Sequence, residues 1–593
     1  MSRAEDFMRY LELSEWIREL STPELTGVKN AKEYVKKIGV NYQRMRELNR
    51  TGVAIVQEHV YPSLAREEKL SEEEVRDLFD FCAGLLDPVR IESVDTVLRY
   101  KIAVRLKEDA EEKNDTAQLI RALDILIECC YLMILMTARM YPATQAVEEY
   151  RREGMEACLR LCAFLEHDAF AALPDAECKE IILVNARYIC AMFEGNTKPY
   201  TVEENEEHLA LMRRALALAD DPFYLDEASK YDWKRHRYRA LQGIASLTDY
   251  HNAQGFTKEQ LKEINAHTRH LIALYKQDKV LYGALSSPDV MNLMLYRNAY
   301  LSGETSLKTY RKQLLELTRD ADKEDFSHDG NMKMVFAQTE YLLTLNPEKL
   351  SEQDQEWLQK FYRDLVQYVT LMPKLGSLTI LLSYLSHALD GFIETKDGMR
   401  FGTICKQLLA AINPPTWRHC LIVAELSVCI AGHLYEREPS LFSGVSGYPD
   451  REKVLSFIHE AAQLHDVGKL YIAEAVTNYT RNYFNDEHEM LLSFPAIGAN
   501  LLSSQESTRP YAEIARNHMD HTWDKDIATQ IVSYADRMGW VTRDGEEIAR
   551  VQIPFIDAMC REESIAKELD AIVDGRKQME QVYEMLREQT GEH

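Results

Sequence analysis

Apolar residues recur at intervals of three and four over most of the first 400 positions, in segments of 12 to 20 residues divided by short polar breaks. Residues 206–222 (EEHLALMRRALALADDP) and 358–375 (LQKFYRDLVQYVTLMPKL) show this spacing, which predicts amphipathic helices. The segments LSEEEV (70–75) and LSEQDQ (350–355) predict helix starts, because a serine there can accept a backbone N–H of the first turn. The succession of helices predicts helical hairpins stacked into an α-solenoid, with a plain all-α domain without repeats as the alternative.

The pattern changes after the segment AAINPPTWRHC at residues 410–420. Two consecutive prolines are incompatible with a helix interior, so a new helix is expected just after them. We therefore predict a helical region over residues 1–410 and a second helical domain over 415–593. In the second domain, residues 419–436 are apolar almost all round and predict a buried central helix. Residues 451–466 predict an amphipathic helix, with Gly468 as its C-cap.

Length and composition narrow the class of protein. The 593 residues allow about four modules of ordinary domain size. The formal net charge of −26 is spread along the chain without a basic face, which disfavours binding to a nucleic-acid duplex. The eleven cysteines predict buried, reduced thiols. The first residues lack the apolar core of a signal peptide, and no apolar run reaches 18 residues, so we expect a cytoplasmic protein outside the membrane.

One of three His-Asp pairs carries further signals of chemistry. The pairs at 167–168 and 328–329 lack such signals and are interpreted as surface polar residues, whereas His465-Asp466 closes a predicted helix and is followed by Lys469. Hydrolysis of a phosphate ester needs a cation held by histidine and carboxylate side chains, with positions left open for water and substrate. A nearby lysine can bind a phosphoryl oxygen. The alternative is a buried histidine and aspartate that only satisfy each other.

The order His419, His465-Asp466 and Asp536 resembles the HD superfamily of metal-dependent phosphohydrolases. The flanking sequences HCLIVAELSVCIA, LHDVGKL and IVSYADRM are similar to the family's stretches around its first histidine, its His-Asp doublet and its final aspartate, respectively. The resemblance covers roughly residues 415–580. It implies that His419, His465, Asp466 and Asp536 bind one divalent metal (Mn, Mg or Fe) and that Lys469 contacts the phosphoryl oxygens.

Within that superfamily the chain looks closest to the HD-GYP phosphodiesterases, which linearise bacterial cyclic dinucleotides. The segment FPAIGANLL at 494–502 has Phe494 where the subgroup has a histidine, and RNHMDHTWD has Met519 where it has another. The subgroup's Gly-Tyr-Pro loop is missing, because Gly447-Tyr448-Pro449 lies before the His-Asp pair and reads as an inter-helix turn. These departures favour a reduced site with one ion. His518 matches the first histidine of the subgroup's His-His-Glu segment. It could donate a proton to the leaving oxygen, contact the substrate or support a metal ligand through a hydrogen bond.

The leading hypothesis is therefore an all-α, cytoplasmic and bacterial phosphohydrolase or phosphodiesterase acting on a nucleotide or cyclic dinucleotide. The segments 208–222 and 340–351 resemble tetratricopeptide repeats, which implies a protein or peptide partner at the helical region. The competing hypothesis is a catalytically impaired HD domain that serves as a signalling or scaffold module. Binding of the protein to a nucleic-acid duplex or a membrane is not expected.

Overall fold

The computed structural model describes most of the chain. The described residues are 3–21, 31–65, 68–87, 92–93, 95–137, 145–185, 200–218, 220–223, 233–248, 255–279, 288–372, 385–395, 397–471, 480–519, 525–544 and 553–590. Within them the structure is all-α, as predicted, and β structure is confined to a two-residue ladder between β1 (Leu86–Asp87) and β2 (Glu92–Ser93).

In the described part of the helical region, helices that follow one another in the sequence pack together, such as α5 on α6 and α13 on α14, which is consistent with a helical-hairpin solenoid. Its first half contains α1 (Arg3–Ser21), α2 (Ala31–His59), α3 (Tyr61–Ala65), α4 (Glu72–Gly84), α5 (Thr96–Lys113), α6 (Thr116–Thr137), α7 (Gln145–Ala163), α8 (His167–Ala171) and α9 (Ala176–Asn185). Its second half contains α11 (Val202–Leu218), α13 (Trp233–Ser246), α14 (Lys258–Gln277), α16 (Pro288–Leu301), α17 (Leu307–Leu317), α18 (His328–Asn331), the π-helix η2 (Met332–Ala337), α19 (Gln338–Leu343), η3 (Pro347–Lys349), α20 (Glu352–Leu371) and α22 (Phe401–Ile412).

Local sequence signals set the ends of several of these helices. Ser71 and Ser351 cap α4 and α20 as predicted, each in a reciprocal capping box with the acidic residue three positions later. Asn114 ends α5 in the left-handed conformation, with φ 55°, so that the chain turns at once into α6. Helix α6 is strongly apolar, and Leu126, Ile127, Cys130 and Met133 on it are fully buried.

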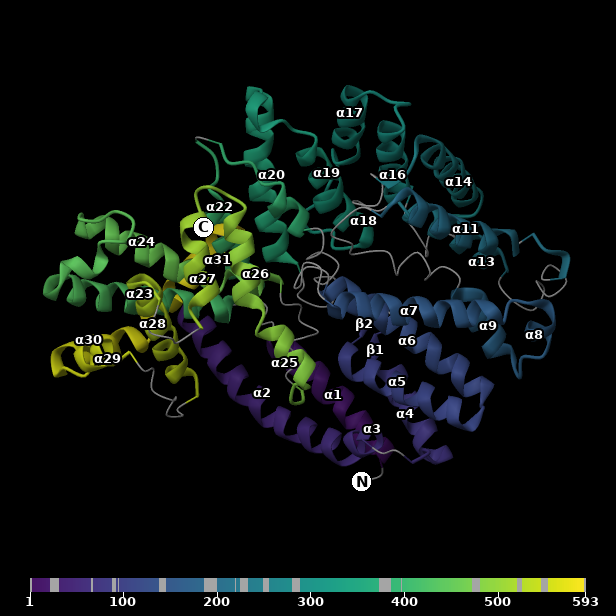
Figure 1. Ribbon diagram of the computed structural model, residues 1–593, viewed down its shortest axis with the longest axis horizontal. Helices are drawn as coiled ribbons and strands as arrows, with labels where there is room; N and C mark the ends of the chain where they lie inside the picture. Colours follow the sequence, from purple (N-terminus) through teal and green to yellow (C-terminus); the bar gives the residue numbers. More distant parts are fainter. Residues whose placement is uncertain are drawn as a thin grey trace.

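The helices follow an arc (Figure 1). From α1–α7 it passes through α8 and α9 to the row from α14 to α20, and it ends at the C-terminal domain. Helix α2 extends from the start of this arc to the C-terminal domain, where it contacts α31 (Arg576–Thr590), while α20 and α22 contact the same helix from the other end of the arc. The C-terminal helix therefore joins both ends of the helical region. The likeness to tetratricopeptide repeats remains a prediction.

The C-terminal domain is also helical. It contains α23 (Pro414–Arg437), η4 (Pro439–Phe442), α24 (Arg451–Leu464), η5 (Val467–Tyr471), α25 (Asn485–Leu491), α26 (Phe494–Ser503), η6 (Arg509–Tyr511), α27 (Ala512–Asn517), α28 (Ile527–Asp544), α29 (Pro554–Cys560), α30 (Glu563–Val573) and α31. The predicted central helix is α23, which packs against α22, α24, α28, α30 and α31. It begins at Pro414 rather than after the prolines, because Asn413 caps it and a proline fits the first turn.

Two features correct or qualify the sequence interpretation. Gly468 is not the C-cap of α24, because the helix ends at Leu464 with His465 as its cap and Gly468 lies inside the 3₁₀ turn η5. One hydrophobic core passes through the predicted boundary and includes Leu408 from one side and Trp417 from the other. The division at 410–415 remains a prediction, and the two parts are packed together.

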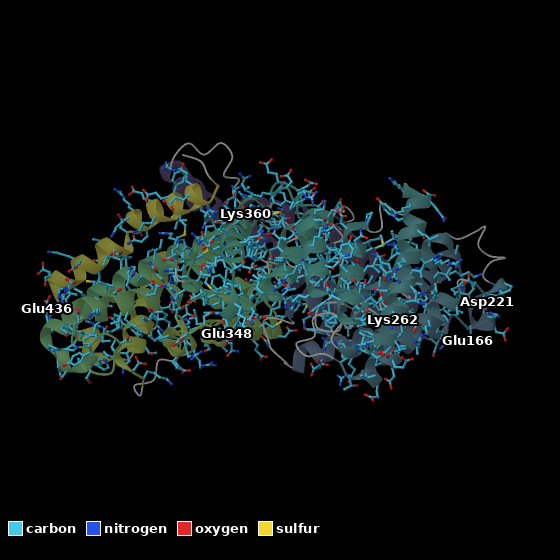
Figure 2. The ribbon with its side chains drawn as sticks, turned by 90° about the horizontal axis from the view of Figure 1, so that it is seen from above. Glu166, Asp221, Lys262, Glu348, Lys360 and Glu436 are labelled. Atoms are coloured by element: carbon cyan, nitrogen blue, oxygen red, sulfur yellow. The ribbon has the colours of Figure 1, made fainter. Side chains whose placement is uncertain are left out.

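The molecule is elongated when viewed from above (Figure 2). Glu436 lies at one end, in the C-terminal domain, and Glu166 and Asp221 of the helical region lie at the other. Within the described residues, no helix combines the length and the apolar character needed to cross a bilayer.

Candidate metal centre

Three helices of the C-terminal domain bring the four predicted ligands together. His419 projects from α23, Asp536 from α28, and His465-Asp466 from the junction between α24 and η5. His419 Nε2 donates a hydrogen bond to Asp536 Oδ1 at 2.7 Å, and His465 Nε2 lies 3.4 Å from the same oxygen. Asp466 Oδ2 lies 3.6 Å from His465 Nε2 and 3.9 Å from His419 Nε2. The residues that the sequence pattern grouped are neighbours in the structure.

His518 joins this group at the end of α27. Its Nε2 lies 3.6 Å from Asp466 Oδ1, and its ring centroid lies 4.8 Å from that of His465. Ligand atoms of His419, His465 and Asp466 lie within 4.8 Å of one another, and so do those of His465, His518 and Asp536. His518 is thus in reach of a shared cation, a position that the sequence pattern alone did not specify.

His465 and His518 are oriented by the same local device. Each is the C-cap residue of a helix, α24 for His465 and α27 for His518, where the last backbone carbonyls lack helical partners. His465 Nδ1 donates to Ala462 O at 2.6 Å, and His518 Nδ1 donates to Ala515 O at 2.7 Å. With the proton on Nδ1, the lone pair is on Nε2, which faces the carboxylates. A backbone partner on the second ring nitrogen is the usual arrangement for a metal-binding histidine.

Three polar atoms at the centre are buried without a hydrogen-bond partner among the described residues. They are His465 Nε2, Asp466 Oδ1 and His518 Nε2. A buried polar atom left unpaired costs about 1–3 kcal/mol, so three converging on one place call for a ligand. If the histidine and the aspartate only formed hydrogen bonds with each other, no buried polar atom would remain without a partner. The residues present therefore fit a divalent cation with nitrogen and oxygen ligands.

Electrostatics favour a cation at the same place. Burial alone would raise the pKa of Asp466 and of Asp536, but Lys469 and His465 for the first, and His419 and His465 for the second, outweigh it and hold both pKa values below the ordinary range. Both carboxylates are therefore ionised. When a cation replaces the proton on His465, the two carboxylates exceed the single positive charge of Lys469 by one negative charge.

The two nearest histidines differ in protonation. Burial lowers the pKa of His419, which keeps its imidazole neutral. Burial also acts to lower the pKa of His465, but the adjacent Asp466 carboxylate, together with Cys420 and Asp536, more than offsets this and places the pKa well above its ordinary value. A proton therefore competes with a cation for His465 Nε2, as expected of a metal ligand.

Lys469 lies at the solvent side of the centre. Its Nζ lies 2.5 Å from Asp466 Oδ2, and it also lies 4.4 Å from the centroid of the Phe494 ring. Phe494 in turn lies 5.7 Å from the His518 ring, centroid to centroid. Sequence reasoning identified Phe494 only as a lost ligand, whereas the structure shows it as the apolar surface that positions the lysine. The sequence signal that could have indicated this role is the aromatic residue at a position where the HD-GYP subgroup has a histidine.

Close backbone packing maintains this geometry. A Cβ atom at Gly468 would stand 2.0 Å from Phe494 O, so only glycine lets η5 and the start of α26 meet. Gly539, one turn after Asp536 on α28, faces the His419 ring, where a Cβ would stand 3.0 Å from Cε1. These glycines allow three elements to converge on the ligands.

Other histidines of the domain lie apart from this centre. His488 is exposed and His459 is half-buried, and neither belongs to a candidate ligand group. His433 forms a second group with Cys429 and Glu568, but the group is partly exposed and His433 Nε2 already pairs with Glu568 Oε2 at 3.1 Å. It fits a cation less well, because no buried donor is left over.

The remaining predicted features are not ligands here. The Gly447-Tyr448-Pro449 triplet is the turn before α24, with Gly447 at φ 94°. Met519 is 39% exposed, at the end of the described segment. The aspartates and histidine at 520, 521 and 524 lie outside the described residues.

Comparison with known families agrees with the geometry. The sequence profile described as "HD domain" matches residues 416–539, which contain every residue of the centre. This part of the chain is an HD domain, and HD domains form a superfamily of metal-dependent phosphohydrolases. No curated protein matches the chain.

Proposed function

We propose that the HD domain hydrolyses the phosphate ester of a nucleotide or cyclic dinucleotide, and that the helical region regulates it. The observation that supports hydrolysis most directly is the set of buried, unpaired atoms His465 Nε2, Asp466 Oδ1 and His518 Nε2. Groups built only for stability would be paired, whereas these are oriented toward a common point. The substrate class rests on the resemblance to the HD-GYP phosphodiesterases.

The ligands and the substrate-binding group have separate tasks. His419, His465, Asp466 and Asp536 would hold one divalent ion, with His518 as a further donor beside Asp466. The ion supplies positive charge that activates water and offsets the charge of a phosphoryl group. Lys469 is only 13% exposed and is oriented by Phe494, so it can bind a phosphoryl oxygen with little loss of side-chain freedom.

The residues of the centre also restrict the identity of the metal and the size of the substrate. The histidine-and-aspartate set suits Mn²⁺, Fe²⁺ or Zn²⁺, and with more of its coordination left to water it suits Mg²⁺. The less buried groups His419, Asp536 and Lys469 form the side from which a substrate reaches the ion, while His465 and His518 are at most 1% exposed and form its floor. This arrangement fits a small anionic substrate better than a large one.

The competing proposal is an HD domain that binds its ligand without turnover and serves as a signalling module. The replacement of a ligand position by Phe494 supports it, because the aromatic ring removes one donor from the centre. In either case we propose a protein or peptide partner for the helical region, and a cytoplasmic, bacterial setting follows from the family resemblance.

Metal content and hydrolysis, measured on one preparation, test the proposal. The purified protein is expected to contain a divalent metal and to hydrolyse a member of a panel of nucleotides and cyclic dinucleotides with Mn²⁺. Asp466→Ala and His465→Ala should abolish turnover, whereas His459→Ala, on the same helix but outside the centre, should not. Metal binding without turnover of any panel member would favour the signalling module, and the absence of both bound metal and turnover would refute the hydrolase.

A further inference from the structure

A buried ion cluster joins the HD domain to the first helices of the chain. Arg481 precedes α25, and its side chain is fully buried together with those of Asp95 and Glu487. Asp95 is the N-cap residue of α5 and accepts the Leu98 backbone N–H at 3.0 Å. Arg481 and Asp95 are 386 positions apart in the sequence. The cluster therefore links the segment before α25 to the N-terminus of a helix in the other part of the molecule.

The arginine uses all of its donors in this cluster. Its Nε and Nη2 bind the two oxygens of Asp95 at 2.8 Å each, and Nη1 and Nη2 bind the two oxygens of Glu487 at 2.7 and 2.9 Å. The fifth N–H reaches Asn482 O at 2.9 Å. Two bidentate carboxylates fix the guanidinium in position and orientation, which a flexible lysine could not reproduce.

Further contacts hold the same segment against the N-terminal helices. Lys101 of α5 pairs with Asp486 of α25 at 2.8 Å and also lies 4.8 Å from the centroid of the Phe484 ring. The Phe484 ring packs against Tyr61 of α3, with centroids 5.5 Å apart. A Cβ at Gly52 of α2 would stand 2.1 Å from Thr480 O, so the backbones meet directly. Helices α2, α3 and α5 all contact residues 480–486.

The other end of this segment meets the metal centre. Helix α25 ends at Leu491 and α26 begins at Phe494, whose ring positions Lys469 and lies beside His518. The backbone of α26 packs tightly on η5, where Gly498 N would lie 2.6 Å from a Cβ at Gly468. The segment from Arg481 to Phe494 is thus anchored to the N-terminal helices at one end and forms a wall of the centre at the other.

We propose that Arg481 is a positioning residue of the HD centre. The Asp95–Arg481–Glu487 cluster and the adjacent Lys101–Asp486 pair fix α25 and α26 on the N-terminal helices. This fixation places Phe494 and Lys469 over the metal ligands. The statement that the placed lysine serves substrate binding rests on the proposed function. The ligands His419, His465, Asp466 and Asp536 come from other elements, so their hold on a cation does not depend on this anchor. Displacement of the N-terminal helices loosens the lysine and leaves the ligands in place.

The test uses the partly exposed pair, because removing Arg481 leaves two carboxylates buried. Lys101→Ala breaks the contact to α25, and Lys107→Ala is the matched control, since Lys107 lies on the same helix and pairs with Glu153 at 3.2 Å away from the HD domain. Hydrogen–deuterium exchange of residues 494–503 in the full chain should rise about two- to fivefold in Lys101→Ala. It should stay at the wild-type level in Lys107→Ala. The charge exchange Lys101→Asp with Asp486→Lys should restore protection.

Binding of inorganic phosphate to the Mn²⁺-loaded protein gives a second readout. Phosphate affinity should fall by about the same two- to fivefold factor in Lys101→Ala while Mn²⁺ affinity stays at the wild-type value, a split that general destabilisation does not produce. Arg481→Lys should act in the same direction and more strongly. Unchanged exchange of residues 494–503 in Lys101→Ala, or an equal change in Lys107→Ala, overturns the proposal. If the wild-type protein binds no Mn²⁺, the proposed function fails, and the exchange comparison still decides this inference.

Discussion

Asp536→Asn is the substitution that probes the metal centre most directly. The asparagine keeps the shape of the side chain and an oxygen that can accept the hydrogen bond from His419 Nε2, which spans 2.7 Å in the wild-type protein. It removes one of the two negative charges that face the cation. We therefore expect the fold to persist and metal affinity to collapse.

The magnitude follows from Coulomb's law. A pair of unit charges 4 Å apart is worth about 4 kcal/mol at an effective dielectric constant of about 20. A divalent ion carries twice that charge and lies closer to its ligand, so about 4 kcal/mol is a lower bound, equivalent to a loss of about 1000-fold in Kd. The wild-type protein should gain about 2.7 kcal/mol of stability at a free metal concentration of 100 times its Kd, and lose it on chelation. The asparagine variant should gain almost none at the same concentration.

Titration with Mn²⁺, followed by paramagnetic resonance and by the thermal unfolding midpoint, measures both effects. Asp557→Asn is the control, because Asp557 lies on α29 of the same domain and accepts a hydrogen bond from Tyr534 at 3.1 Å, outside the centre. Its Kd and its metal-induced shift should match the wild type. A Kd for Asp536→Asn within tenfold of the wild-type value would refute the assignment of Asp536 as a ligand.

Three further predictions concern other groups. His518→Ala should weaken metal binding by about 10- to 100-fold, less than the loss of a carboxylate, and an unchanged Kd in the same titration would place His518 outside the coordination sphere. Gly468→Ala should lower stability by about 1–3 kcal/mol in urea unfolding, because its Cβ would stand 2.0 Å from Phe494 O, whereas Gly444→Ala, with open space around it, should be neutral. Burial lowers the pKa of His208 to about 4, so the unfolded chain takes up the proton first and stability should fall as the pH drops from about 6.5 to about 4. His208→Phe should flatten that part of the pH profile of the unfolding midpoint, and an unaltered slope would contradict the assignment.

Structural features that depend on residues close together in the sequence could be predicted from the sequence. The capping serines Ser71 and Ser351 set helix starts through contacts within three residues, so the pattern alone located both. The grouping of His419, His465-Asp466 and Asp536 was accessible because family spacing encodes a contact between distant helices. These four residues lie together, and their role as ligands stays a prediction for the titration to test.

The features that could not be predicted depend on contacts between distant parts of the chain. No local pattern distinguishes Arg481 from a surface arginine, because its partner Asp95 lies 386 positions away. Gly468 was interpreted as a helix cap because a glycine after a helix usually has that role. Its actual constraint comes from Phe494 O, on a helix that packs across it.

The ligand count favours a single ion over two. The first cation can draw on His419, His465, Asp536 and one oxygen of Asp466, namely Oδ2, which lies 3.6 and 3.9 Å from the two imidazole nitrogens. These four protein ligands suffice for one ion, with His518 as a further donor in reach, and still leave positions for water and substrate.

A second cation would have fewer protein ligands among the described residues. On the other side of Asp466, the described residues offer Oδ1 and His518 Nε2, which are 3.6 Å apart. The Phe494 ring lies beside them, 5.7 Å from the His518 ring between centroids, and it carries no lone pair for a metal. Two donors beside a fixed cation are too few for a stable site, so the expected stoichiometry is one metal ion per chain. Elemental analysis that finds two tightly bound ions per chain would contradict this expectation.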